Sequence, residues 1–211
     1  MKVAVITEGS TKHRNADVVA AAESLGLEVL NLGMKNEPDE PDLSYLETAF
    51  LSALVLNLKV VDFVLGGCGT GQGYMNAVLQ FPGTACGLLL DPVDAFLFSQ
   101  VNAGNCISFA LNKGYGGVGG DINLKYMLKE LFAHPYGQGY PEARREIQVA
   151  ARRRLEKLSA LSHRSMEEIL DVMDPIVLHT ALDFPGIRAC VEAAPESSLK
   201  RKVLELSLIH I

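Results

Sequence analysis

Five short apolar segments alternate with helical patterns along the first half of the chain, and this alternation limits the possible folds more than any other feature. The apolar segments cover residues 2–7, 27–33, 61–67, 84–90 and 105–111. Between them, apolar residues recur at helical spacing near 16–25 and 43–59, and a further helix starts at Pro92. Strands that alternate with helices lie parallel, because a helix supplies the crossover that parallel pairing needs. The sequence therefore predicts an α/β fold, a three-layer doubly wound parallel sheet of Rossmann-like type.

The pattern becomes entirely helical after the glycine-rich segment 112–121. Apolar residues recur at helical spacing in 122–133, 142–161, 165–173 and 196–205. We therefore expect residues 1–140 to form the Rossmann-like domain and residues 141–205 to form a helical C-terminal extension. The extension contains a group of arginines: Arg144, Arg145, Arg152, Arg153 and Arg154. A solvated helix face explains them most simply, and an arm that docks on a neighbouring subunit is the alternative.

The last six residues, LSLIHI at 206–211, follow a charged amphipathic helix and do not resemble its natural continuation. They match the translation of CTGTCTCTTATACACATC, a transposon-end adapter used in sequencing libraries. We expect residues 206–211 to be a sequencing-adapter artefact, so they take no part in the fold prediction.

Charge and cysteine spacing exclude several classes of protein. A net charge of −6 and a pI near 5.4 argue against nucleic acid or an anionic membrane as the main partner. No apolar stretch is long enough to cross a bilayer, and the N-terminal run turns polar at Thr7, too early for a secretion signal. The four cysteines form no CxxC pair, which favours reduced thiols in the cytoplasm over disulfides or zinc.

The stretch VDFVLGGCGTGQGYMN, residues 61–76, joins an apolar strand to a helix through a glycine-rich turn. Cys68 therefore lies at the carboxyl end of the third strand, at the edge of an open parallel sheet where ligands bind. Glycines let the backbone approach a ligand closely, and the adjoining helix N-terminus favours the thiolate form of a cysteine. A thiolate beside backbone N–H donors can remove a proton next to a carbonyl while the donors stabilise the enediolate that forms.

Other chemistries of glycine-rich loops fit this spacing less well. A Walker-type phosphate loop needs Gly-Lys-Ser/Thr at its end, but Gln72 follows Gly71. A dinucleotide fingerprint belongs after the first strand rather than the third, and a C-x5-R phosphatase loop needs an arginine where Tyr74 stands. A cysteine that is merely packed in a tight turn is the alternative to a reactive one.

The segment from Gly66 to Ala110 resembles the type B ribose-5-phosphate isomerase and galactose-6-phosphate isomerase family. It carries that family's C-G-T-G-x-G loop, a Pro-Gly turn, an acid-Pro step and an N-x-x-N segment before the last strand. The resemblance extends over roughly residues 1–145, and the C-terminal helices have no counterpart in the short family members. It implies an aldose–ketose isomerase that needs neither a metal nor an organic cofactor.

The same resemblance assigns roles to individual residues. Cys68 would move a proton between C1 and C2 of an open-chain sugar, and Thr70 would assist ring opening. The substrate-binding groups that it implies are the backbone amides of Gly69, Gly71 and Gly73 and the side chain of Asn102. Because the family builds its site between two subunits, a homodimer or a homotetramer with shared active sites is also implied.

Four sites depart from the family pattern, and at one of them Leu79-Gln80 stands where the family has Asn-Lys. Thr7-Glu8 stands where the family has Asp-His, and Glu8 can supply the acid. The ring-opening histidine falls on Val101, which cannot exchange a proton, and the phosphate-binding arginine falls on Asn112-Lys113. The substrate therefore stays open among ribose 5-phosphate, galactose 6-phosphate, another sugar phosphate, and an unphosphorylated sugar that needs no ring opening.

Cationic side chains near the same sheet edge are candidates for binding the far end of the substrate. Lys12, His13 and Arg14 follow the first strand, and Lys113 follows the fifth. A solvated loop is the alternative for the first three, and His13 is also a candidate for the role of the missing histidine. If none of these side chains converges with Cys68, within or across subunits, a phosphorylated substrate is disfavoured.

Two hypotheses follow from these observations. The first is an aldose–ketose isomerase that acts on a sugar phosphate through a cis-enediolate, with Cys68 as acid and base. The second is a non-catalytic protein of the same fold that binds a sugar phosphate or a nucleotide.

Overall fold

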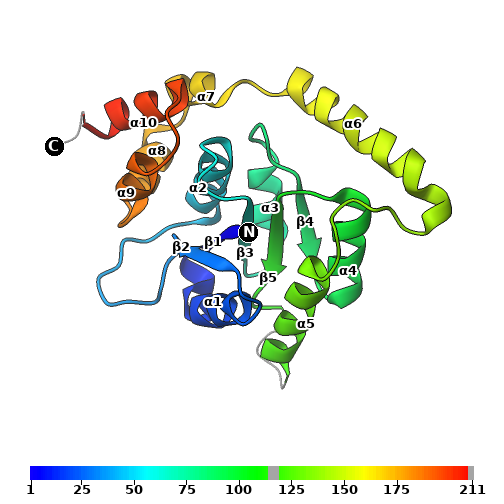
Figure 1. Cartoon of the computed structure of the whole chain (residues 1–211). Coiled ribbons are helices and arrows are strands. Elements are labelled where there is room, and N and C mark those ends of the chain that lie inside the picture. The colour runs from blue at the N-terminus through cyan, green and yellow to red at the C-terminus, as the bar shows by residue number, and fades with distance from the viewer. Residues whose placement is uncertain (114–118, 209–211) are drawn as a thin grey trace.

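Five parallel strands form the central sheet of the computed structural model, which describes residues 1–113 and 119–208. Their spatial order is β2-β1-β3-β5-β4. The strands are β1 (Lys2–Ile6), β2 (Glu28–Asn31), β3 (Phe63–Cys68), β4 (Cys86–Leu89) and β5 (Cys106–Ala110). The predicted class is confirmed: the chain has an α/β fold with an all-parallel, doubly wound sheet between helical layers (Figure 1).

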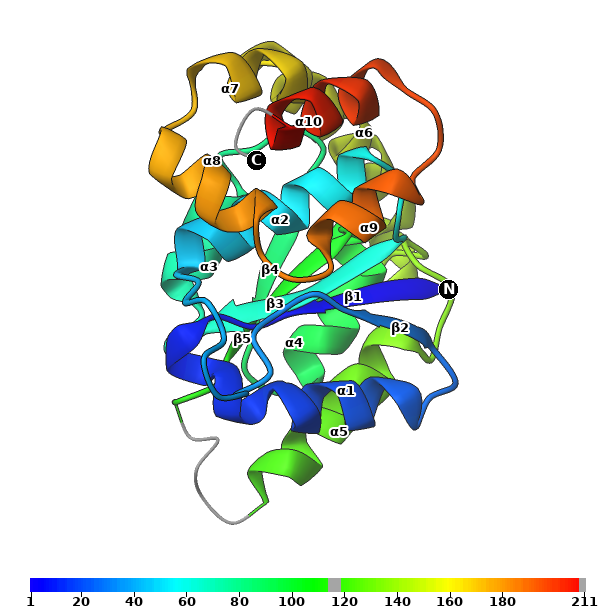
Figure 2. The same cartoon turned by 90° about the vertical axis from the view of Figure 1, so that its left-hand side faces the viewer.

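Helices cover both faces of the sheet (Figure 2). One face packs against α1 (Asn15–Glu23), α4 (Pro92–Leu97) and α5 (Gly120–Phe132), and the other against α2 (Tyr45–Asn57) and α3 (Gln72–Val78). Alternate residues of one strand serve opposite faces, so Val3 and Val5 pack on the α1 side whereas Ala4 and Ile6 pack on the α2 side. Such a sheet needs central strands that are largely apolar on both faces, and β1, β3 and β5 show this pattern.

The connections determine where a ligand can bind. β1 continues through the 3₁₀ turn η1 (Gly9–Arg14) into α1 on one face, whereas β3 continues into α3 on the other face. β1 and β3 are neighbours in the sheet. The connections that follow β1 and β3 therefore run to opposite faces of the sheet. This point, where the direction of the connections changes, is the topological switch point, and ligands bind there in open α/β sheets.

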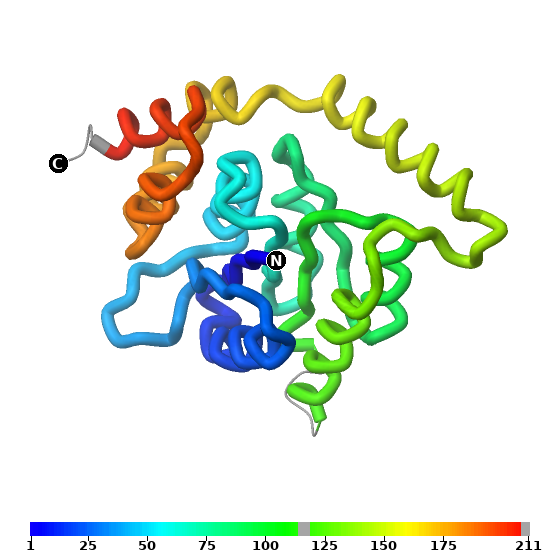
Figure 3. The backbone as a smooth tube through the Cα atoms, viewed as in Figure 1, coloured from blue at the N-terminus to red at the C-terminus, as the bar shows by residue number. Residues whose placement is uncertain are grey.

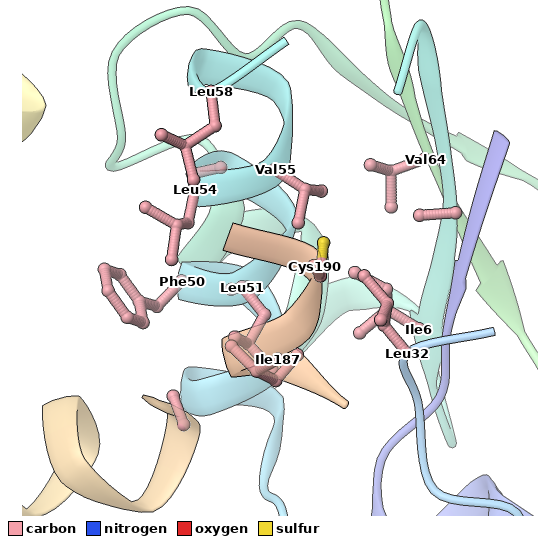
Figure 4. Close-up of a cluster of buried hydrophobic side chains, with 14 of the residues drawn as sticks. Ile6, Leu32, Phe50, Leu51, Leu54, Val55, Leu58, Val64, Ile187 and Cys190 are labelled. Atoms are coloured by element: carbon pink, nitrogen blue, oxygen red, sulfur yellow. The ribbon is translucent and has the colours of Figure 1, made fainter. Parts of the chain in front are cut away.

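Five helices follow the sheet domain. They are α6 (Arg145–Ser162), α7 (Met166–Val172), α8 (Pro175–Leu182), α9 (Ile187–Glu192) and α10 (Ser198–Leu208). Side chains of α7 to α10 join the apolar cluster of α2, so that α2 is covered on the side away from the sheet. Figure 4 shows Ile187 and Cys190 of α9 beside Leu51 and Val55 of α2.

Two helices of this region, α8 and α9, were not predicted from the sequence. Both are short, with eight and six residues, and a bend at Phe184-Pro-Gly separates them. A local signal for α8 is nevertheless present, because the Asp174 carboxylate accepts hydrogen bonds from the backbone of Ile176 and Val177 and Pro175 opens the helix. The predicted helix that starts at Pro92 has the same Asp-Pro arrangement, because the Asp91 carboxylate accepts hydrogen bonds from the backbone of Val93 and Asp94.

The domain division stays a proposal. We keep 1–140 as the Rossmann-like domain and 141–205 as the extension, with a hydrophobic core that the two share around α2. Helix α10 runs to Leu208, while residues 209–211 of the suspected adapter artefact lie outside the described residues. Within the described residues, every helix is too short or too polar to traverse a bilayer.

Leu54 lies on α2 between the sheet and the extension and is fully buried. We expect Leu54→Ala to lower the free energy of unfolding by about 2–5 kcal/mol, because it leaves a cavity that both layers line. Leu46→Ala on the same helix is the matched control, since Leu46 is 43% exposed and its loss should cost well under about 1 kcal/mol. Urea denaturation followed by circular dichroism measures both, and equal costs would contradict the shared core.

Candidate active site

Cys68 is the last residue of β3 and borders the switch point between β1 and β3. Its main chain is fixed on two sides, because the Cys68 carbonyl accepts hydrogen bonds from Leu111 N (3.1 Å) and Gly71 N (3.2 Å). The residue is 8% exposed, and its side chain belongs to the apolar cluster on the α2 side of the sheet. The sulfur therefore lies at the rim of the core, held by strand β3 beneath it.

The glycine loop after Cys68 closes tightly onto the neighbouring strands. Gly71 has φ +75°, and a Cβ there would lie 2.4 Å from Leu88 Cδ1. Its N–H group donates to the Cys68 carbonyl, so this amide serves the loop itself and is not available to a substrate. Gly73 differs, because a Cβ there would meet Tyr45 at 3.6 Å and Cys68 Sγ at 3.7 Å, both ordinary contacts. The hydrogen of Gly73 thus leaves space beside the sulfur.

Tyr45 is a site residue that the sequence analysis did not identify. It lies in the first turn of α2, is 43% exposed, and places its ring next to Gly73 on the side where Cys68 lies. A signal for it exists, since Ser44 and Glu47 form a capping box that marks the start of α2. Because α2 is the next element after β2, its first turn lies at the edge where the parallel strands end and ligands bind, and Tyr45 is in that turn.

In an open α/β sheet, ligands bind in the crevice above the carboxyl ends of the strands at the switch point, here between β1 and β3. The loop after β1 places Glu8 at this edge. Glu8 is 7% exposed, and its carboxylate accepts hydrogen bonds from both the backbone N–H (2.8 Å) and the hydroxyl of Ser10. Asn112, just beyond β5, donates through Nδ2 to the Ser10 carbonyl at 2.9 Å, and its backbone N–H donates to the Gly69 carbonyl at 3.0 Å. Asn112 therefore ties the β1 loop to the glycine loop, a role that the sequence did not reveal.

The predicted cations lie around this crevice at different places. Lys12, His13 and Arg14 stand on η1, at the same sheet edge as Cys68, and Arg14 lies 3.9 Å from Asp17. Lys113 instead lines a separate cavity of about 140 Å³ between the ends of β4 and β5 and helix α5, with Leu89, Phe109 and Asn123. Thr70 is exposed in the glycine loop, where its hydroxyl lies 3.4 Å from Gln72 N.

Asn102 is not brought to Cys68 within one chain. It ends the π-helical turn η2 (Phe98–Asn102), which precedes the amino end of β5, whereas Cys68 pairs with Ala110 at the carboxyl end of that strand. Four residue steps along β5, from Cys106 to Ala110, separate the two edges by about 13 Å. The backbone beside Asn102 is held by Arg152, whose guanidinium donates to the carbonyls of Val101 and Gly137, both at 2.8 Å.

Among the described residues, no group of three or more His, Cys, Asp or Glu side chains is placed to hold a metal ion. The polar groups that line the crevice are a thiol, a buried carboxylate, hydroxyls, an amide and backbone N–H groups. This set is suited to moving a proton and to binding hydroxyl or carbonyl oxygens.

Comparison with known proteins now decides the family. A model of the Ribose/Galactose Isomerase family matches residues 3–148, which is more than half of the chain. The chain belongs to this family. It is therefore an isomerase of the sugar-isomerase type, and both the predicted resemblance and the prediction of an enzyme are confirmed. The match begins in β1 and ends just inside α6, so it includes every element of the crevice.

Two solved structures match the whole chain, including the helical extension. A ribose-5-phosphate isomerase from Vibrio parahaemolyticus is 35% identical with a TM-score of 0.91, and the match covers 100% of this chain and 99% of that one. A 4-deoxy-L-threo-5-hexosulose-uronate ketol-isomerase in complex with a tartrate is 34% identical with a TM-score of 0.93. That match covers 99% of this chain and 100% of the ketol-isomerase.

Shorter members of the family share only the fold. A ribose 5-phosphate isomerase from Thermotoga maritima is 18% identical with a TM-score of 0.60. The match covers 74% of this chain and 97% of that one. The extension of this isomerase is thus shared with the two full-length relatives and exceeds the length of the shorter protein. A search of curated proteins gives no match.

The space beside the Cys68 sulfur can be tested at Gly73. We expect Gly73→Ala to leave the free energy of unfolding within about 1 kcal/mol of wild type, because its Cβ meets only ordinary contacts and alanine favours a helix. The methyl group would nevertheless occupy space between Tyr45 and the sulfur, so turnover should fall by about tenfold or more.

Gly71→Ala is the contrasting variant. Its Cβ would clash with Leu88 at a φ that alanine disfavours, so we expect a loss of about 2 kcal/mol or more in the free energy of unfolding. Thermal unfolding and turnover measured on both variants check the pair. A Gly73→Ala protein with full turnover would show that substrate does not use this space.

Proposed function

We propose that the chain is an aldose–ketose isomerase in which Cys68 transfers a proton between adjacent carbons through a cis-enediolate. The observation that carries the proposal is the position of Cys68: it ends a central strand at the switch point, with space beside its sulfur at Gly73. Cysteine thiolates act as bases at such edges when backbone donors and a helix start lie close by.

The reaction balances without any redox partner. The thiolate takes the proton from C2 of an open-chain aldose, and the electron pair of that C–H bond forms the C1–C2 double bond of the enediolate. The C1 carbonyl electrons move onto O1, which gains a proton as O2 loses one. The thiol then returns its proton to C1 and gives the ketose, so the chemistry requires no organic cofactor.

Residues around Cys68 take supporting roles in this proposal. The amides of Gly69 and Gly73 face the developing oxyanion, while that of Gly71 holds the loop in shape. The hydroxyl of Thr70 and the carboxylate of Glu8 bind substrate oxygens, and Tyr45 covers the sugar. His13 and Arg14 on η1 face the far, anionic end of the substrate, and Lys113 is the weaker candidate because it lines the neighbouring cavity.

A second copy of the chain completes the site in this proposal. Asn102 lies at the opposite edge of the sheet from Cys68, so one chain cannot bring the two together. A homodimer, or a homotetramer built from it, would place Asn102 of one copy at the crevice of the other. A cytoplasmic setting is proposed with it, because all four cysteines are free thiols.

A sugar phosphate of the ribose 5-phosphate or galactose 6-phosphate type is the first candidate substrate. The family and the full-length relative from Vibrio parahaemolyticus support it, as do the cationic residues of η1 at the correct edge. Phosphate favours Arg and Lys beside backbone N–H groups. This candidate requires a group that opens the sugar ring, for which Thr70 and His13 are available.

An open-chain keto-uronate is the second candidate, and a specific observation favours it. The ketol-isomerase that matches 99% of this chain is named for 4-deoxy-L-threo-5-hexosulose uronate. That compound has a ketone at C5 and no hydroxyl at C4, so it cannot close a furanose or pyranose ring onto C1. It needs no ring opening, which agrees with Val101 at the position where the family has its ring-opening histidine.

The role of Cys68 is tested by proton exchange. We expect Cys68→Ala to abolish the exchange of the C2 proton with solvent deuterium, by about a thousandfold or more, while the protein folds normally. Cys190→Ala is the control, because that thiol lies on α9 within the core. NMR of the substrate in D₂O measures the exchange. Exchange that persists in Cys68→Ala would disprove the mechanism, and tight binding without exchange by wild type would favour the non-catalytic alternative.

The substrate class is tested with the wild-type protein. Ribose 5-phosphate, galactose 6-phosphate and 4-deoxy-5-hexosulose uronate are compared by kcat/KM in the same assay. A preference of about tenfold or more for the uronate would select the open-chain acid, and the reverse order would select the sugar phosphate.

A further inference from the structure

The proposed isomerisation moves two protons, and only one of them belongs to Cys68. Besides the carbon-bound proton, a proton must leave O2 and reach O1 before the enediolate becomes the ketose. Oxygens O1 and O2 of a cis-enediolate lie on the same side of the double bond, so one group close to both can carry this proton. A hydroxyl with a carboxylate behind it suits the transfer, because the carboxylate can accept the proton and return it.

Ser10, in the 3₁₀ turn η1, places its hydroxyl at the glycine loop. A Cβ at Gly69 would lie 3.4 Å from Ser10 Oγ. Asn112 fixes the two segments relative to each other, because its side chain donates to the Ser10 carbonyl and its backbone N–H donates to the Gly69 carbonyl. Ser10 is an exposed residue, whereas its partner Glu8 is buried. The hydroxyl therefore lies beside the residue whose amide faces the oxyanion in the proposed reaction.

The carboxylate of Glu8 stands directly behind this hydroxyl. Ser10 Oγ donates to Glu8 Oε1, and Ser10 N donates to Glu8 Oε2 at 2.8 Å. The backbone of Glu8 is fixed as well, since its carbonyl accepts from Thr11 N at 2.9 Å and from Thr11 Oγ1 at 3.2 Å. No ion pair in the part of the chain that the structure describes includes Glu8. A carboxylate has more acceptor sites than the two that Ser10 occupies, so the Glu8 oxygens can accept a further proton.

Two threonines at the same edge lack such an arrangement. Thr7 is buried, and its hydroxyl donates to the Met34 carbonyl at 2.8 Å. Thr70 lies in the glycine loop, and its hydroxyl lies 3.4 Å from the backbone N–H of Gln72, which is a donor and cannot take up a proton. Ser10 differs from both threonines, because its hydroxyl is accessible and donates directly to a carboxylate.

We propose that Ser10 and Glu8 form a proton relay that moves the hydroxyl proton of the enediolate from O2 to O1. The O2–H bond breaks as its proton passes to Ser10 Oγ, while the proton of the Ser10 hydroxyl moves to a Glu8 oxygen. The electron pair of the O2–H bond stays on O2, which becomes the ketone oxygen. The reverse transfers form the O1–H bond, so the hydroxyl and the carboxylate are regenerated and nothing is oxidised or reduced.

Ser10 contacts the substrate in this relay and is a catalytic residue, whereas Glu8 reaches the substrate oxygens through it. The inference rests on the proposed function and assigns a transfer that Cys68 does not perform. Loss of the relay separates two rates that a loss of structure would lower together. Cys68 can still remove the C2 proton, but the enediolate then returns to the aldose more often, because O2 cannot pass its proton to O1.

NMR in D₂O measures both rates on one sample, as deuterium at C2 of the recovered substrate and as ketose formed, and we call their quotient the partition ratio. Ribose 5-phosphate, galactose 6-phosphate and 4-deoxy-5-hexosulose uronate are each used as substrate. We expect Glu8→Gln to raise the partition ratio by about tenfold or more and to slow ketose formation by about a hundredfold, because an amide takes up no proton. Ser10→Ala should act in the same way, and Ser10→Thr should restore the ratio to within about threefold of wild type, because it returns the hydroxyl.

Asp42→Asn is the matched control for the lost carboxylate. A Cβ at Gly9, the residue between Glu8 and Ser10, would lie 2.6 Å from Asp42 Oδ1, so this carboxylate is close to the relay, but Asp42 is exposed. Figure 3 shows its loop, between β2 and α2, in light blue, where it projects from the side of the sheet domain. The partition ratio of Asp42→Asn should equal that of wild type.

The results distinguish the relay from the reaction that it serves. If wild type exchanges the C2 proton and the partition ratio is unchanged in Glu8→Gln, the relay is wrong and the role of Cys68 stands. If Glu8→Gln lowers exchange and ketose formation equally, the carboxylate only holds the loop after β1 in shape, and the relay is again wrong. A wild-type protein that exchanges no C2 proton with any of the three substrates would overturn the proposed function and the relay with it. Circular dichroism checks that each variant is folded.

Discussion

The ring of Tyr74 lies where the side chain of residue 66 would otherwise be, and the geometry of the crevice depends on this contact. A Cβ at Gly66 would stand 2.2 Å from the ring, so only glycine lets α3 approach β3 so closely. The Tyr74 hydroxyl donates to Ser52 Oγ on α2 at 2.6 Å and lies 3.4 Å from Cys106 Sγ on β5. Burial raises the pKa of Tyr74 well above its usual value, which keeps the hydroxyl a neutral donor. One side chain thus joins α3, α2 and β5 beneath the loop that carries Cys68.

Much of the fold, and the position of Cys68, could be predicted from local sequence. Apolar strands alternate with helices, and the glycine loop follows the third strand, so the edge of the sheet that holds the thiol is fixed by chain order alone. Local sequence marks Tyr45 only as the start of a helix at this edge, and it does not mark Ser10 and Asn112 as site residues at all. They meet Gly73 and Gly69 only because loops from β1, β2 and β5 converge above β3, and that convergence depends on the strand order β2-β1-β3-β5-β4.

Two helices of the extension, α8 and α9, were not predicted from the local sequence pattern. Both are short, and they are stable because α2 offers them an apolar surface, not because their own sequence favours a helix strongly. The wholly buried middle of α2, from Glu47 to Val55, is consistent with a helix that packs on both sides. The Thermotoga maritima protein matches only 74% of this chain and is too short to include the whole extension. The outer side of the corresponding helix there must be covered by something other than the complete extension.

Arg152 holds the turn that carries Asn102 against the segment that leads to α6. Its guanidinium binds the carbonyl of Val101, next to Asn102, and also that of Gly137, in the segment that leads to α6. A planar guanidinium with two such bonds fixes both segments relative to each other better than a flexible ammonium could. The turn that carries Asn102 is therefore positioned in part by a side chain of α6. In the proposed dimer, the same contact sets the position from which Asn102 reaches the site of the second copy.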